Sequence, residues 1–373
     1  MSADNNRTKR LVIKIGSSLI TANGKGLDFE RLKNWTRQIS EIKTMGHEVV
    51  IVSSGAVAEG MLRLGWNIRP SMIHDLQAAA AVGQMGLIRA YEDAFQNLDL
   101  HTAQILLTHD DLTNRTRYLN ARSTLSTLLD LNIVPIVNEN DSIATDEIKF
   151  GDNDTLAALA ANLIEAETLI ILTDQEGLFS GDPRTSSEVH IIRSADAGDP
   201  ELEKMATDNG SASGSGGMIT KLRAAKQAAK GGTHTVIANG RESNILLRIK
   251  AGEAIGTRLN ATKPVMTARR QWLSNHLKVS GSVTIDEGAI NAITQSNKSL
   301  LPIGVTSTSG NFKRGDVVTC QNKAGKVIAH GLINYNHEET QKIKGCPSEK
   351  IEDALGYVDD LELINRDNLA IEY

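Results

Sequence analysis

The chain has few cysteines, few aromatic residues and no long apolar run, and each scarcity argues against a class of protein. Cys320 and Cys346 are its only cysteines, too few for a disulfide framework and not spaced as metal ligands. Phe, Trp and Tyr together make up 3% of the residues, which disfavours a platform that stacks single-stranded bases. The apolar segment 11–15 is too short for a signal-peptide core or a membrane span. We therefore expect a cytoplasmic protein that does not contact a membrane.

The chain also lacks an excess of positive charge. Its 40 Lys and Arg residues face 45 Asp and Glu residues, which gives a formal net charge of −5. This balance provides no overall positive field for binding nucleic acid. A length of 373 residues is enough for about two or three domains with a substantial core.

Short aliphatic and β-branched runs alternate with longer helical patterns through residue 258. This alternation predicts an α/β fold of the αβα sandwich type with a mainly parallel central sheet. A helix is predicted between the first two runs, capped by Asp28 and ending at Gly46. Its expected buried face consists of Phe29, Leu32, Ile39 and Ile42. The predicted strands are residues 11–15, 49–52, 105–107, 133–137, 169–172 and 235–237.

The chain after residue 258 has a different pattern. Residues 259–276 contain a polar stretch followed by a basic one, which predicts a linker with a short helix. Later residues hold short strand patterns separated by glycine turns, at 282–285, 304–306, 316–320 and 327–330. We therefore expect an α/β domain over 1–258, the linker over 259–276, and a small, mostly β domain with a C-terminal tail over 277–373.

Small and polar residues follow four of the predicted strands. Ligands of open parallel sheets bind beyond the carboxyl ends of the strands, so these segments are expected to meet at one edge of the sheet. Each of them alone is also typical of an ordinary turn, but together they favour a binding site. The segments are Gly16-Ser17-Ser18, Ser53-Ser54-Gly55-Ala56, Asn138-Glu139-Asn140-Asp141 and Thr173-Asp174.

A glycine-rich run, residues 213–217, precedes a helical pattern that contains Lys221. Glycines allow backbone N–H groups to approach an anion, the start of a helix adds partial positive charge, and Lys221 adds a full charge. The spacing is not that of a Walker A loop. A second lysine, Lys14, lies in the first predicted strand, where burial without a partner is costly. We expect Lys14 and Lys221 to hold a triphosphate from two sides.

A third motif, Gly151-Asp152-Asn153-Asp154, stands at the start of an apolar helical pattern. Capping a helix needs one such polar residue, and this motif has three. The surplus suggests a carboxylate that orders the two lysines or a metal, together with an amide that binds substrate. Mg²⁺ keeps most of its waters and uses few protein carboxylates, so the pattern fits a Mg-nucleotide without a dedicated protein metal site.

Six segments follow, in order, the pattern of the amino acid kinase family, and the chain resembles most closely the bacterial members that phosphorylate glutamate. Residues 286–289, 299–302 and 310–315 resemble the small RNA-associated PUA domain that these members often carry. One departure is Ser215, where Thr is more usual, although a hydroxyl is retained. The six segments are residues 12–18, 52–56, 137–141, 151–154, 173–178 and 216–221.

The resemblance implies transfer of the γ-phosphoryl group of ATP, with Mg²⁺, to the side-chain carboxylate of L-glutamate. The implied product is L-glutamyl 5-phosphate, the first intermediate on the way to proline. A glutamate side chain with a pKa of ~4.3 is ionised at neutral pH, so this nucleophile needs no general base. The resemblance also implies feedback inhibition by proline, a homo-oligomer, and functional coupling to the glutamyl phosphate reductase.

The same resemblance assigns roles to single residues. Lys14 and Lys221 are expected to stabilise the transferred phosphoryl group, and Asp154 to organise them. Asp141 is expected to hold the α-ammonium of glutamate. Ser54 and Asn153 are expected to hold its carboxylate oxygens, with Gly55 in the same pocket. The nucleotide is expected to contact Lys14, Gly16, Thr173, Asp174, Ser215, Gly216, Gly217, Met218, Ile219, Thr220 and Lys221.

Two other functions remain open from the sequence. The first is a kinase of the same fold that acts on acetylglutamate, aspartate or UMP, although no additional basic cluster near Ser54 or Asp141 announces a second phosphate. The second is an RNA-binding protein that acts through residues 277–355. RNA binding is unproven on this pattern, because scattered loop charges are typical of a solvated surface. These charges are Arg269, Arg270, Lys313, Arg314, Lys323 and Lys326.

Overall fold

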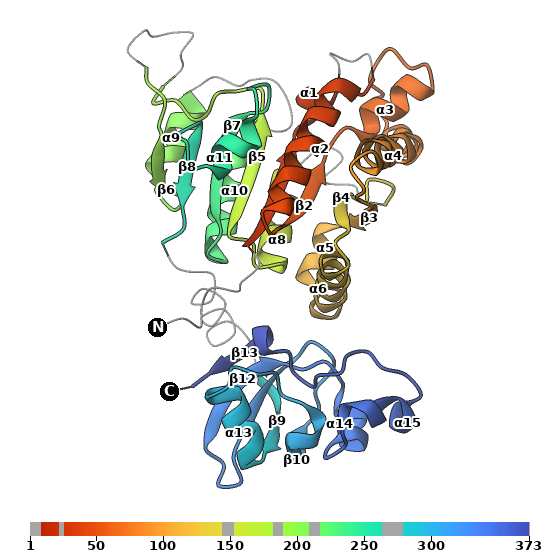
Figure 1. Ribbon diagram of the computed structural model, residues 1–373, viewed down its shortest axis with the longest axis vertical. Coiled ribbons are helices and arrows are strands. Elements are labelled where there is room, and N and C mark those ends of the chain that lie inside the picture. The colour runs from red at the N-terminus through yellow and green to blue at the C-terminus, as the bar shows by residue number, and fades with distance from the viewer. Residues whose placement is uncertain are drawn as a thin grey trace. The chain divides into compact units, whose positions relative to one another are not determined.

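The computed structural model describes residues 9–21, 26–143, 153–181, 189–208, 217–262 and 279–372. These residues form two compact units, an N-terminal one that holds nearly all described residues up to 262 and a C-terminal one over 279–372 (Figure 1). Each unit has a sheet of its own. No helix in the described ranges combines the length and the apolar character needed to cross a bilayer.

The sheet of the N-terminal unit has eight strands among the described residues, in the order β3-β4-β2-β1-β5-β7-β8-β6. Neighbouring strands are parallel except for the pair β7 and β8. The predicted αβα fold with a mainly parallel sheet is therefore confirmed. The strands are β1 (Lys9–Ile15), β2 (His47–Ser53), β3 (Thr102–Leu107), β4 (Val134–Glu139), β5 (Thr168–Thr173), β6 (Ser194–Asp196), β7 (His234–Asn239) and β8 (Thr257–Asn260).

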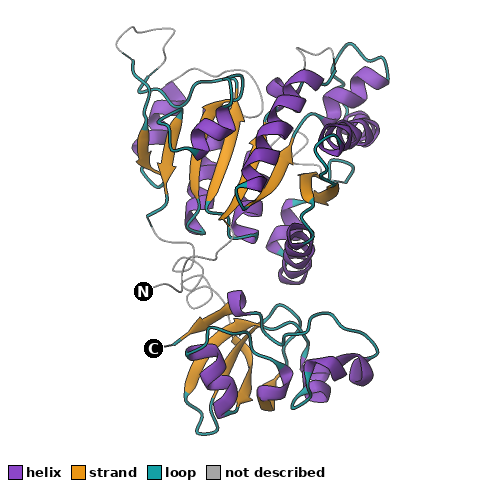
Figure 2. Ribbon diagram, in the orientation of Figure 1, coloured by secondary structure: helices purple, strands orange, loops and turns teal. Residues whose placement is uncertain are grey.

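Helices cover both faces of this sheet (Figure 2). The main apolar core lies on the face covered by α2, α4 and α11, while α8 and α10 contact each other and the strands β1, β5 and β7. The helices up to residue 262 are α1 (Ser17–Ile20), α2 (Phe29–Thr44), α3 (Ala56–Arg63), α4 (Ile73–Gln96), α5 (His109–Thr113), α6 (Arg115–Asp130), α8 (Asn153–Leu163), α9 (Glu201–Asp208), α10 (Met218–Lys230) and α11 (Ile245–Lys250).

Side-chain alternation along β1 places Lys14 on the side of α8 and α10. Leu11, Ile13 and Ile15 belong to the core cluster shared with α2 and α4. Successive side chains of a strand point to opposite faces, so Lys14 lies on the other face. The lysine thereby faces the helices that carry Asp154 and Lys221.

The predicted helix after Asp28 is confirmed as α2, and the Asp28 side chain accepts a hydrogen bond from the backbone N–H of Arg31 (3.1 Å). Gly46 follows the helix in the left-handed conformation, with φ of 84°. Leu32, Ile39 and Ile42 are buried, but Phe29 is 56% exposed, so its place on the buried face was wrong. Phe29 is the first residue of the helix and lies off the centre of the buried stripe.

Helices α3 and α4 pack with their backbones close together. A Cβ at Gly83 would lie 1.9 Å from the Ala56 carbonyl oxygen, so only glycine fits between the two helices there. This contact holds α4 against the turn that follows β2, because Ala56 is the first residue of α3.

Strand β8 extends two residues past the boundary predicted at residue 258, to Asn260. Its pairing with β7 and β6 places these residues in the first sheet. Residues 263–276 of the predicted linker lie outside the described residues, so the domain boundaries stay a prediction.

The C-terminal unit is a small, mostly β structure, as predicted. Its sheet has the order β10-β9-β11-β12-β13, with only β9 and β11 parallel among the described neighbours. The strands are β9 (Val279–Ile285), β10 (Val305–Gly310), β11 (Val317–Gln321), β12 (Val327–Leu332) and β13 (Leu369–Ile371). The helices are α13 (Glu287–Thr294), α14 (His337–Ile343) and α15 (Ile351–Leu355), with 3₁₀ turns η1 (Pro302–Gly304), η2 (Ser348–Lys350) and η3 (Arg366–Asn368).

Candidate active site

The predicted polar segments lie at one edge of the large sheet. Strands β4, β2, β1 and β5 are consecutive neighbours and run parallel, so their carboxyl ends meet at the same edge. Gly16 follows β1, Ser54 follows β2, Asp141 lies two residues beyond β4, and Asp174 follows β5. The sheet order separates them into a β2/β4 side and a β5/β7 side, with β1 between the two.

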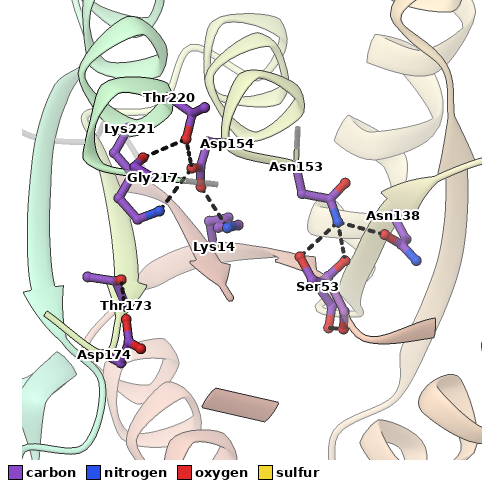
Figure 3. A network of polar contacts seen from close by, with 11 residues as sticks. Lys14, Ser53, Asn138, Asn153, Asp154, Thr173, Asp174, Gly217, Thr220 and Lys221 are labelled. Carbon is purple, nitrogen blue, oxygen red and sulfur yellow. Dashed lines mark hydrogen bonds and ion pairs between the residues drawn. The ribbon is translucent and has the colours of Figure 1, made fainter. Parts of the chain in front are cut away.

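An ion-paired centre joins three of the predicted residues (Figure 3). Lys14 Nζ lies 2.6 Å from Asp154 Oδ1, and Lys221 Nζ lies 3.2 Å from Asp154 Oδ2. Thr220 Oγ1 donates a hydrogen bond to the same Oδ2 (2.8 Å). The structure thus brings Lys14 and Lys221 together at Asp154, and their catalytic roles stay a prediction.

The three charged side chains are almost completely buried. Lys14 is 6% exposed, Lys221 5% and Asp154 1%. Two buried ammonium groups thus share the carboxylate of Asp154. Two ammonium groups side by side form a setting that suits an anionic ligand.

The environment shifts the pKa of two of these groups. Burial raises the pKa of Asp154, but the charges of Lys14 and Lys221 and hydrogen bonds from Lys14 and Thr220 outweigh it and hold that pKa at about 2. Burial lowers the pKa of Lys221, the Asp154 charge opposes this, and the Lys14 charge adds to it. Asp154 is consequently a permanent anion at neutral pH.

The start of α10 adds further positive potential beside Lys221. Gly217 is the N-cap, and as a glycine it has no side chain with which to cap the helix. The first backbone N–H groups of a helix have no partner within it and attract anions. Among the predicted nucleotide contacts, Met218, Ile219 and Thr220 form the first turn of α10. Ser215 and Gly216 lie outside the described residues, as do Gly151 and Asp152.

Thr173 ends β5 and Asp174 follows it, on the same side of the site. Thr173 Oγ1 donates a hydrogen bond to Asp174 Oδ1 (3.2 Å). The Asp174 charge is close enough to raise the pKa of Lys221, although burial of that lysine has the larger, opposite effect. Both residues therefore border the ion-paired centre, as predicted for the nucleotide side.

A second cluster, on the β2/β4 side, is built from neutral groups. Asn153 Nδ2 donates to the Ser53 carbonyl (3.0 Å), to Ser54 Oγ (2.9 Å) and to Asn138 Oδ1 (3.0 Å) (Figure 3). Gly55 follows as the N-cap of α3, with φ of 104° in the left-handed region. Ser54, Gly55 and Asn153 are thus brought together as predicted.

The direction of these hydrogen bonds changes the role predicted for Asn153. A backbone carbonyl can only accept, so the atom facing the Ser53 carbonyl must be the amide nitrogen. Its two hydrogens are shared among three acceptors, and the oxygen Oδ1 is the end left over. An oxygen cannot hold the carboxylate oxygen predicted for it, so Asn153 is suited to an ammonium group instead.

Gln84 and Tyr91 were not predicted near the site, and Asn138 was predicted only as part of a polar segment, with no role of its own. Asn138 bonds Asn153, Gln84 accepts a hydrogen bond from Asn138, and the Tyr91 hydroxyl lies 3.0 Å from Ser53 Oγ. Gln84 and Tyr91 belong to α4, far from the strand ends in sequence. In the sequence, Gln84 differs from its neighbours only as a polar residue within a stretch of small and apolar helix residues.

The site offers little to a resident metal ion. In the parts of the chain that the structure describes, no group of three or more His, Cys, Asp or Glu side chains is placed to hold one. Both oxygens of Asp154 are engaged by lysines and Thr220. The two ammonium groups and the start of α10 suit the phosphates of a nucleotide, which would bring its own Mg²⁺.

Comparison with known proteins agrees with this geometry. The sequence model of the amino acid kinase family matches residues 9–239, and that of the PUA domain matches residues 281–355. The chain is 58% identical to the protein "Glutamate 5-kinase" of Nitrosospira multiformis over 98% of each chain, and 58% identical to that of Nitrosomonas eutropha over 97% of each. It is also 58% identical to that of Paraburkholderia phymatum over 98% of each. The chain therefore belongs to the amino acid kinase family, in the form that carries a C-terminal PUA domain.

Proposed function

We propose that this chain transfers the γ-phosphoryl group of ATP to the side-chain carboxylate of L-glutamate, releasing ADP and L-glutamyl 5-phosphate. One observation carries the proposal. Asn153 and Asp154 are consecutive residues of the first turn of α8, and they place the neutral cluster beside the ion-paired centre. The nearly full-length similarity to proteins named "Glutamate 5-kinase" supports glutamate as the acceptor.

The reaction needs positioning and positive charge rather than a base. An oxygen of the ionised glutamate carboxylate forms the new bond to the γ-phosphorus, and the bond from that phosphorus to the bridging oxygen of ADP breaks. No proton is transferred, because the nucleophile is already an anion at neutral pH. Lys14 and Lys221 neutralise charge on the transferred group, and Asp154 fixes both ammonium groups from one point.

The nucleotide would lie on the β5/β7 side of β1. The N–H groups at the start of α10 and Lys221 would hold its phosphates, beside Gly16 at the end of β1. Thr173 and Asp174 would border it at the end of β5. Mg²⁺ would supply charge neutralisation at the phosphates when bound, held mainly by phosphate oxygens and water with Asp174 as the available carboxylate nearby.

The acceptor would lie on the β2/β4 side. We assign the α-ammonium of glutamate to Asn153 Oδ1 and Asp141, which lies in the turn after β4. Ser54 Oγ accepts from Asn153, so its own O–H is available to a carboxylate oxygen. The start of α3 at Gly55 adds backbone N–H groups that have no partner within the helix and could face the same anion.

An acceptor screen tests the proposal. ADP formation is followed with ATP, Mg²⁺ and, in turn, glutamate, acetylglutamate, aspartate and UMP, in the presence and absence of hydroxylamine. Hydroxylamine traps an acyl phosphate as a hydroxamate and does not do so with a nucleoside diphosphate. We expect ADP and hydroxamate with glutamate. Preference for another acceptor, or ADP from glutamate without hydroxamate, would overturn the assignment.

RNA binding by the C-terminal unit is the weaker alternative. Over residues 279–372 acidic residues outnumber basic ones, the wrong sign for attracting a phosphate backbone. RNA affinity of the full-length chain at low and at physiological salt is the discriminating measurement. Tight binding at the higher salt would revive this alternative.

Three further properties follow as part of the proposal. Proline, an amino acid with the same two charged groups at its α-carbon, would compete with glutamate for the acceptor side. The product is a reactive mixed anhydride, which favours its rapid use by the glutamyl phosphate reductase.

Exposed apolar residues, Ile68, Met72 and Met85, support a homo-oligomer, which light scattering would measure.

A further inference from the structure

Gln84 is a buried polar residue that the proposed reaction does not use directly. It is 8% exposed and lies on α4, next to Gly83 and near the buried small residues Ala79 and Ala80. Its Oε1 accepts a hydrogen bond from Asn138 Nδ2 (2.8 Å), and its Nε2 is buried without a hydrogen-bond partner among the described residues. An apolar side chain would avoid the cost of that unpaired donor, so Gln84 is poorly explained by packing alone.

Asn153 donates a hydrogen bond to Asn138, and Asn138 donates one to Gln84. Backbone groups at both ends fix this direction. The backbone N–H of Glu139 donates to Asn138 (2.9 Å), so the accepting end of the Asn138 amide must be its oxygen. Asn138 therefore turns its nitrogen toward Gln84, which can meet it only with an oxygen. At the other end, the Ser53 carbonyl accepts from Asn153 and fixes that amide independently.

The Asn138 side chain consequently lies between the amides of Asn153 and Gln84 and forms a hydrogen bond with each. Its Oδ1 receives the Asn153 nitrogen and its Nδ2 reaches Gln84 Oε1. Loss of the Gln84 acceptor would leave the Asn138 N–H₂ buried and unpaired, and rotation of that amide would bring two nitrogens face to face at Asn153. Either outcome disturbs the orientation in which Asn153 presents its oxygen.

We propose that Gln84 is a positioning residue for the acceptor side: through Asn138 it holds the Asn153 amide with Oδ1 directed to the α-ammonium of the acceptor. The inference rests on the proposed function and extends it to a residue of α4 that touches no substrate. Its effect is confined to acceptor binding, because the chain of hydrogen bonds ends at Asn153 and Ser54 and does not include Lys14 or Lys221.

The test compares steady-state constants of Gln84→Met with those of the wild type. Methionine has a similar unbranched shape and no acceptor oxygen, so we expect the KM for glutamate to rise about tenfold, with kcat and the KM for ATP changed less than about twofold. Gln84→Glu retains an oxygen toward Asn138 and should recover at least half of the lost acceptor affinity. Gln84→Leu serves in place of the methionine variant if the latter does not fold.

Gln38→Leu is the matched control. Gln38 is likewise a buried glutamine, and its Oε1 accepts from the backbone N–H of Leu246 (2.9 Å) on the α2 and α11 side. Its loss should lower the thermal midpoint and leave the KM for glutamate unchanged. An unchanged glutamate KM in Gln84→Met, or a parallel loss in all constants, would overturn this inference alone. Wild-type protein that forms no ADP with glutamate would overturn the proposed function and this inference with it.

Discussion

The two sides of the site differ in the charge of their side chains. The ion-paired centre of Lys14, Asp154 and Lys221 is charged and almost completely buried, whereas the cluster around Asn153 is neutral and consists of amides, hydroxyls and a backbone carbonyl. Charge is needed where a phosphoryl group transfers, and direction is needed where a small zwitterion must be oriented. Changes on the charged side should therefore alter kcat and stability, and changes on the neutral side should alter KM.

The largest effect is expected at Asp154. Asp154→Asn leaves two buried ammonium groups without their carboxylate, and breaking a buried pair in this way costs about 3–5 kcal/mol of unfolding free energy. Urea denaturation measures it, with Asp174→Asn as the control, since Asp174 is an exposed carboxylate at the same edge. Equal stability of the two variants would contradict a central role for Asp154.

The stability difference between wild type and Asp154→Asn is also expected to depend on pH. The folded pKa of Asp154, about 2, lies below its ordinary value of 3.8, so its contribution to stability is fully present above pH ~4 and is lost as the pH falls through about 2. The stability difference between wild type and Asp154→Asn should be constant from neutral pH to about 4 and shrink below it. A difference that began to close near pH 6 would point to another group.

Lys221→Ala should have the next largest effect. Removing one of the two charges on the transferred group is expected to cost at least about 2.7 kcal/mol of transition-state stabilisation, or about a hundredfold in kcat at saturating ATP. Lys226→Ala is the matched control, because Lys226 lies on the same helix with its side chain 50% exposed. Near-wild-type turnover of Lys221→Ala would remove this lysine from the mechanism.

On the neutral side, Asn153→Ala should act on the acceptor. Loss of the amide removes the oxygen assigned to the α-ammonium, which we expect to raise the KM for glutamate at least tenfold, about 1.4 kcal/mol. The KM for ATP should change less than about twofold. A variant in which both KM values rose together would show that the two sides are not separable.

Sequence reasoning located the charged side well because its signals are local. Lys14 follows strand alternation, Asp154 stands at a helix start, and Lys221 follows a glycine run, so each has a recognisable setting in its own segment. Their convergence required only that parallel strands share an edge. The six strands predicted for the large sheet were all found, while the short strand β6 and the edge strand β8 were missed because three or four residues carry little periodic signal.

The neutral side was harder to predict because its partners come from distant segments. Gln84 and Tyr91 lie on α4, and nothing in their own stretch of sequence indicates that Asn138 and Ser53 are opposite them. The orientation of the Asn153 amide could not be predicted either, since it depends on which end meets a backbone carbonyl. Composition and spacing identify an amide, but only the fold decides which of its atoms faces the ligand.

The smallest effect is expected at Tyr91. Its buried hydroxyl lies 3.0 Å from Ser53 Oγ, beside the turn that carries Ser54. Tyr91→Phe removes one hydrogen bond and leaves the packing of the ring, so a loss of about 1 kcal/mol in unfolding free energy and an increase of about twofold to threefold in the KM for glutamate are expected. The control is Tyr357→Phe, whose hydroxyl bonds Glu339 in the C-terminal unit and should not affect either KM. A glutamate KM that stays at the wild-type value in Tyr91→Phe would limit the support from α4 to Gln84, and the acceptor side would then depend on a single contact with that helix.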